Sequence, residues 1–176
     1  MTTHETAAVE SVAQLARRTF AELHQSIVAH EAGSLAGDVE AIHDMRVTIR
    51  RLRVALSNFA VCAPKEDRKR WREQLENLAG ALGGVRDLDV MIAALKSQLL
   101  NHSGEEKAAI SALIRRLRAR RRLRLRALIN YLRGEEYAGF KREFSSEPAS
   151  AGSSEQLPEP LEFPYRVIEE KHGQAA

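Results

Sequence analysis

Apolar residues recur every three or four positions along most of the first 144 residues, which is the spacing of one face of an α-helix. The first such stretch places Val9, Val12, Phe20 and Ile27 on one side. We find no run in which apolar and polar residues alternate over the length of a strand. The pattern therefore predicts an all-α chain.

Interruptions of this pattern predict where the helices begin and end. We expect helices over residues 5–31, 38–62, 66–82, 85–100 and 103–133, and a short sixth over 135–144. Ser103 with Glu106 three residues later has the form of a capping box. Short connections favour antiparallel neighbours, so residues 5–144 should form an antiparallel bundle of about five to six helices. The interruptions are Gly33, Gly37, Asp38, Pro64, Gly83, Gly84 and Gly134.

The remainder, residues 145–176, has a different composition. It holds four of the five prolines, among Ser, Gly, Ala and Glu. Such a segment buries too little apolar surface to offset the entropy of ordering it, so we predict a disordered acidic tail or linker.

Several protein classes are disfavoured. No apolar run approaches the roughly 20 residues that cross a bilayer, and the first residues lack the pattern of a secretory signal. Cys62 is the only cysteine, which excludes an internal disulfide and a cysteine zinc cluster. A cytoplasmic location is expected.

Positive charge is concentrated in the middle of the chain and is carried mainly by arginine. Residues 41–126 contain 20 Lys or Arg against nine Asp or Glu, a net of +11, although the whole chain has only +3. The chain has 21 Arg and six Lys. A high genomic GC content is one explanation for this excess of arginine over lysine, and a binding function is another. A planar guanidinium grips oxyanions through two parallel hydrogen bonds, so the bias suggests a phosphate-binding surface.

The second predicted helix carries a row of potential cations. At about 100° per residue, one stripe about 80° wide lies directly beside the apolar face. Like charges at this spacing destabilise a helix by a few tenths of a kcal/mol per pair. A solvated basic face, or pairing with acids on other helices, would also explain the row. Its place beside the apolar face favours a crevice between helices. The stripe consists of His43, Arg46, Arg50 and Arg53.

The helix over residues 103–133 repeats the design. Eight of the twelve residues from Arg115 to Arg126 are Arg, and Arg115, Arg118 and Arg122 share one side. Arg72, beside Trp71, is a weaker instance. In a bundle such rows can face a common groove and attract a linear polyanion.

Two segments closely resemble the signatures of the CHAD domain, the conserved histidine α-helical domain. The first runs from Asp38 to Arg53 and includes His43, Arg46 and Arg50. The second combines Trp71, Leu75 and Leu82-Gly83 with Arg86-Asp87-Leu88-Asp89. Both lie in family order and at family-like spacing, and the resemblance covers roughly residues 9–144.

This resemblance implies an all-helical fold that binds inorganic polyphosphate in a basic channel, with an association to polyphosphate granules. His43, Arg46, Arg50 and Arg53 match the first motif, and Arg86 matches the second. Further expected polyphosphate-binding residues are Arg72, Arg115, Arg118 and Arg122. Asp87 and Asp89 resemble buried partners that orient arginines.

The family's domain is about twice as long as the part that this chain resembles, which is its N-terminal half. Where the second half should begin, the chain becomes acidic and rich in proline. We expect that a second copy or another protein supplies the missing half, unless the chain is a fragment.

No metal ion, cofactor or catalytic activity is expected. His24 and His30 lie on another helix and on different faces from each other, so His43 lacks companion ligands. Gly83-Gly84 lacks the following Lys and Ser/Thr of a P-loop. The histidine instead suits hydrogen bonding to phosphate, with added charge when protonated.

Two other functions remain open. Basic helices also bind nucleic acids, although aromatics are only 5% of the chain and do not alternate with the stripes as stacking platforms would. A scaffold that takes an acidic protein segment into the groove is the third hypothesis.

Overall fold

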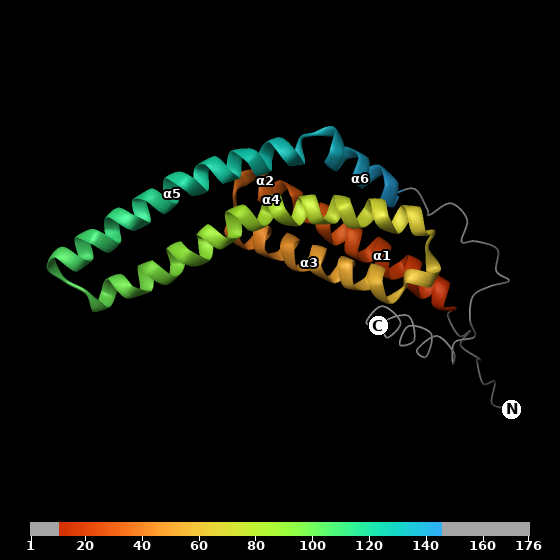
Figure 1. Cartoon of the computed structure of the whole chain (residues 1–176), viewed down its shortest axis with the longest axis horizontal. Coiled ribbons are helices and arrows are strands. Elements are labelled where there is room, and N and C mark those ends of the chain that lie inside the picture. The colour runs from red at the N-terminus through yellow and green to blue at the C-terminus, as the bar shows by residue number, and fades with distance from the viewer. Residues whose placement is uncertain (1–10, 146–176) are drawn as a thin grey trace, which may run out of the picture.

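The computed structural model describes residues 11–145, which form a bundle of α-helices (Figure 1). This confirms the predicted all-α fold. The predicted start at residue 5 and the tail beyond residue 145 lie outside the described residues. Short 3-10 turns at Ala60–Cys62 and Leu99–Asn101 join longer elements. The α-helices are α1 (Val12–Ala29), α2 (Glu31–Ala36), α3 (Val39–Asn58), α4 (Lys65–Gln98), α5 (Gly104–Leu132) and α6 (Glu135–Ser145).

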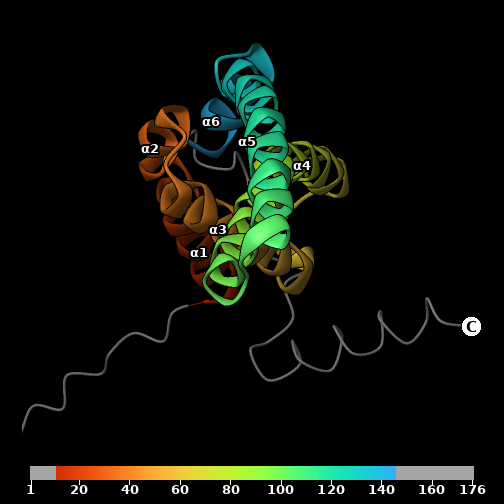
Figure 2. The same ribbon diagram turned by 90° about the vertical axis from the view of Figure 1, so that its left-hand side faces the viewer.

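Helices α4 and α5 form a long hairpin that extends beyond the rest of the bundle. At one end α4 packs against α3, which in turn packs against α1. The far half of the hairpin projects away from these helices (Figure 1), while α2 and α6 close the bundle near α5 (Figure 2). Along the described part of the chain, no helix is both long enough and apolar enough to span a membrane.

Helix α4 runs without a break through Gly83-Gly84, where the sequence predicted two helices over 66–82 and 85–100. That prediction was wrong. Each glycine disfavours a helix interior by about 1 kcal/mol, but the neighbouring Leu82 and Val85 have no solvent exposure. Their burial, at about 1.5–3 kcal/mol per side chain, outweighs the local preference.

Ser103 is the N-cap residue of α5, as the sequence predicted, but the predicted capping box does not form. The Ser103 side chain makes no capping hydrogen bond, and the Glu106 carboxylate instead contacts Nδ1 of His102 at 2.9 Å. A capping box does occur at Ser11, whose hydroxyl accepts from the Gln14 amide at 3.2 Å while the Gln14 side chain accepts from the Ser11 amide at 2.8 Å. Both sites have a serine followed three residues later by Gln or Glu, so this spacing alone does not show which of them forms a capping box.

The core is built from one face of each long helix. Fully buried side chains include Ile27 of α1, Ile49 of α3, Leu78 of α4 and Leu128 of α5. Tyr137 and Phe140 of α6 also enter the core. Each inward face follows the apolar spacing of its sequence, which is why periodicity was sufficient to predict the helices.

A buried ion pair fixes α5 against the base of the hairpin. The Arg121 guanidinium grips the Asp89 carboxylate through Nε and Nη2, the latter at 3.2 Å from Oδ2. Its Nη2 also donates to the Gly37 carbonyl oxygen at 3.0 Å. Asp89 and Arg121 therefore connect α4, α5 and the end of α2. The predicted role of Asp89 as a buried partner of an arginine is confirmed.

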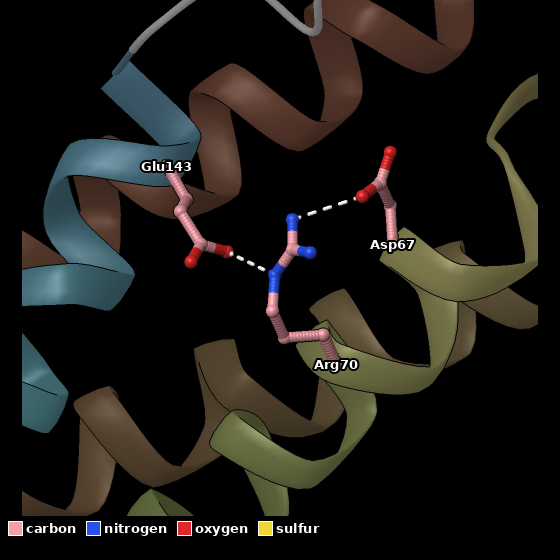
Figure 3. Close-up of polar contacts among 3 residues, drawn as sticks. All are labelled: Asp67, Arg70 and Glu143. Carbon is pink, nitrogen blue, oxygen red and sulfur yellow. Dashed lines mark hydrogen bonds and ion pairs between the residues drawn. The ribbon is translucent and has the colours of Figure 1, made fainter.

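Helix α6 is held by polar contacts to α4 and α2. Arg70 of α4 bridges Asp67 and Glu143, each at 2.9 Å (Figure 3). On the other side the Lys141 ammonium donates to both carboxylate oxygens of Glu31, at 3.1 and 3.0 Å. Arg70 therefore joins two helices of the bundle, although it belongs to the same basic segment as Arg72.

Replacing Asp89 should destabilise the protein, whereas replacing Asp87 should not. Asp89→Ala leaves Arg121 without its carboxylate, and breaking a buried pair costs about 3 kcal/mol. Asp87 is exposed, so Asp87→Ala should change the free energy of unfolding by less than about 0.5 kcal/mol. Urea denaturation of both variants measures the difference. Equal stabilities would contradict a structural role for the Asp89–Arg121 pair.

Stability should fall as the pH drops below about 6.5, the usual pKa of histidine. His24 is buried against Phe140, and burial, together with the Lys141 charge, lowers the pKa of His24. The unfolded chain then binds a proton that the folded chain excludes, so the free energy of unfolding decreases by at most about 1.4 kcal/mol per pH unit from this group. Denaturation curves between pH 7 and 5 measure the slope, which His24→Gln should reduce.

Candidate anion-binding groove

A groove of about 690 Å³ lies between α3 and α4. Its α3 side carries the complete basic stripe predicted from the sequence, and Arg86 faces it from α4. The structure thus brings five of the nine predicted site residues to one surface. The lining residues are His43, Arg46, Val47, Ile49, Arg50, Arg53, Glu76, Ala79, Gly80, Arg86, Asp87 and Val90.

The stripe faces this groove because the adjoining face of α3 is completely buried. Ile42, Met45, Ile49, Leu52 and Leu56 have no solvent exposure, so they fix the rotation of α3 in the bundle. Residues next to this face on the helical wheel emerge at the edge where α3 meets α4. The basic side chains are therefore held beside α4 by the packing of their apolar neighbours.

Arg46 reaches the backbone of α4, where a glycine makes room for it. Its Nη1 donates to the Ala79 carbonyl oxygen at 3.2 Å. A Cβ atom at Gly83 would overlap that same nitrogen. Gly83 therefore creates the space in which the Arg46 guanidinium lies against the α4 backbone.

The other groove arginines are not neutralised by ion pairs. Within residues 11–145, no carboxylate lies within ion-pair distance of Arg50, Arg53 or Arg86. Arg50 and Arg53 are exposed, while Arg86 is half-buried. Two acids, Glu76 and Asp87, also line the groove. Four arginines thus face two carboxylates, and the excess of positive charge is available to an anion.

The remaining predicted site residues lie elsewhere on the surface. Arg72 is exposed on α4, one turn before Glu76 and outside the groove lining. Arg115, Arg118 and Arg122 are exposed on α5 and do not line the groove. As binding residues these four stay predictions, and the structure places them apart from the α3 stripe.

Two features of the groove were missed or misjudged in the sequence. Asp87 was expected to be a buried partner, but it is exposed and lines the groove. The role of Gly83 was missed, because this residue was interpreted as the end of a helix. The helical pattern of the sequence continues on both sides of Gly83, and a glycine inside such a pattern often has a packing reason. The part of the chain that the structure describes has no cluster of three or more His, Cys, Asp or Glu placed to hold a metal ion.

Comparison with known families agrees with this geometry. The family model of the CHAD domain matches residues 18–170. The chain belongs to the CHAD domain family. The match includes every groove residue and also continues past residue 145. No curated protein matches the sequence. CHAD domains are linked to the binding of polyphosphate, so the family and the cationic groove indicate the same class of phosphate-rich ligand.

Gly83→Ala should weaken anion binding without destabilising the fold. A Cβ at this position displaces the flexible end of Arg46, while alanine favours a helix interior by about 1 kcal/mol over glycine. Gly139→Ala in α6 is the matched control, since it lies outside the groove lining and a Cβ there meets only Nη2 of Arg142, at 4.0 Å. Calorimetric titration with tripolyphosphate and urea denaturation measure both properties. Equal affinities for the two variants would contradict the proposed effect of Gly83 on Arg46.

Proposed function

We propose that this CHAD-family chain binds inorganic polyphosphate in the groove between α3 and α4. The observation that carries the proposal is the row of arginines, fixed along one helix and joined by Arg86 from the next, without carboxylate partners among the described residues. Family membership supports the same ligand class. His43, Arg46, Arg50, Arg53 and Arg86 are the proposed contacts.

The chemistry of the groove suits a linear phosphate polymer. Arginine can hold a phosphate through two parallel hydrogen bonds, and the stripe presents one cation about every turn of α3. From His43 to Arg53 the helix rises about 15 Å. A polymer with a charge on every unit can contact successive arginines along this length, whereas a single phosphate contacts one or two. Affinity should therefore decrease steeply with salt.

We propose binding without catalysis. The groove lining includes no Ser, Thr, Cys or Lys among the described residues, so its candidate nucleophiles for covalent phosphate transfer are limited to His43, Glu76 and Asp87. Its acids, Glu76 and Asp87, oppose anion binding and do not accompany a metal cluster in the described region. A binding module could bring proteins to polyphosphate granules, and a second copy or partner could complete a longer channel.

Removing two groove charges should weaken polyphosphate binding selectively. We expect Arg50→Gln with Arg53→Gln to lower the affinity for long-chain polyphosphate by roughly 10- to 30-fold, because each exposed ion pair contributes at most about 1 kcal/mol. The salt dependence should become shallower as well. Arg17→Gln with Arg51→Gln removes the same charge from exposed positions outside the groove lining. Equal losses for both pairs, measured by titration calorimetry, would exclude the groove as the site.

Competition distinguishes polyphosphate from nucleic acid. Long-chain polyphosphate should displace labelled DNA from the full chain at much lower phosphate concentration than DNA displaces polyphosphate. Equal competition by the two polymers would indicate a general polyanion binder.

Arg50→Lys with Arg53→Lys should keep only part of the polyphosphate affinity of the wild-type chain, because lysine lacks bidentate geometry.

A further inference from the structure

We propose that a long polyphosphate leaves the groove by crossing α4 at Gly80 and Gly84 and continues onto Arg120 and Arg124 of α5. This rests on the proposed function and extends its site. It also assigns the contribution of α5 to a different pair of arginines from the row of Arg115, Arg118 and Arg122 predicted from the sequence.

The first observation is the position of Arg124. A Cβ built on Gly84 would lie 3.5 Å from Cδ, 3.9 Å from Cγ and 3.9 Å from Nε of this arginine. The side chain of Arg124 therefore lies along the surface of α4. The preceding residue, Gly83, accommodates Arg46 from α3. Two arginines from different helices thus approach α4 at consecutive residues.

The second observation is the low surface of α4 between them. Gly80 is exposed, lines the groove, and has no atom within 4 Å of a built Cβ. Gly84 follows four residues later, on the same side of the helix. Neither residue has a side chain to obstruct a polymer that passes over α4. Two residues without side chains therefore lie on α4 between the groove and Arg124.

Acidic residues bracket this crossing. Glu76 lies four residues before Gly80, and Asp87 lies three residues after Gly84. Both line the groove, and both repel a polyanion. The stretch of α4 between the two carboxylates rises about 16 Å, and it contains both glycines. Charge therefore favours passage over the glycines and disfavours it at either end.

Helix geometry separates the arginines of α5 into two edges. Measured from buried Ile114 at about 100° per residue, Arg120 and Arg124 lie at about 240° and 280°. Arg118 and Arg122 lie at about 40° and 80°, on the opposite edge. Since Arg124 lies against Gly84, the first edge faces the crossing. The Arg121–Asp89 pair holds α5 in this rotation.

Polymer length is the property that this second contact should control. A short phosphate chain fills the groove alone, whereas a long chain can engage the groove and α5 together. The second contact is then intramolecular, so it raises affinity for long chains without changing affinity for short ones. Length dependence thus distinguishes the crossing from a general increase in charge.

The test compares two double variants of the full chain with two ligands. Arg120→Gln with Arg124→Gln should lower the affinity for long-chain polyphosphate about tenfold while the affinity for tripolyphosphate changes less than about twofold. Its salt slope for the long polymer should fall by about one to two. Arg118→Gln with Arg122→Gln, also exposed on α5, should lower long-chain affinity less than about threefold. Circular dichroism and urea denaturation verify that each variant folds.

The outcomes separate this inference from the proposed function. If the two α5 pairs have equal effects on long-chain binding while Arg50→Gln with Arg53→Gln lowers it by the expected factor, the groove stands and the crossing is wrong. A wild-type chain that binds neither ligand would overturn both. Gly84→Glu is an independent variant, because it adds a carboxylate beside Arg124. It should reduce long-chain binding more than tripolyphosphate binding, and equal reductions would contradict the crossing.

Discussion

The arrangement of α3 depends on one constraint: a fully buried apolar face lies directly beside a row of cations. Isolated, this helix would be weakened by repulsion among Arg46, Arg50 and Arg53. In the bundle, burial of Ile42, Ile49 and Leu56 contributes far more than this repulsion removes. The core therefore holds like charges together at the edge of α4, and an anion that neutralises them would relieve the remaining repulsion.

The second side of the groove follows from the continuity of α4. A helix that ended at Leu82 would not carry Arg86 into the groove or Asp89 to Arg121. Because α4 continues, a single helix forms one wall of the groove, carries Gly80 and Gly84, and provides Asp89 as the partner of Arg121 on α5. The same continuity extends α4 and α5 beyond the other helices, where their surfaces remain uncovered by the described bundle (Figure 1).

Much of this could be predicted from local sequence. Helical periodicity predicted the all-α bundle, and the wheel of α3 predicted that His43 and its neighbouring arginines share one surface. Local patterns could not decide whether Gly83 ends a helix, since the answer depends on burial of Leu82 and on Arg46 from another helix. They also could not rank the α5 arginines, because the rotation of α5 is fixed by contacts from Arg121 to residues 32 and 84 positions away.

The space at Gly83 has a consequence for how this sequence can vary. A side chain at position 83 and a long guanidinium at position 46 compete for the same volume. A shorter residue at position 46 would remove that competition, so substitutions tolerated at 83 depend on what occupies 46. The two positions should therefore show epistasis, although they lie 37 residues apart in the chain.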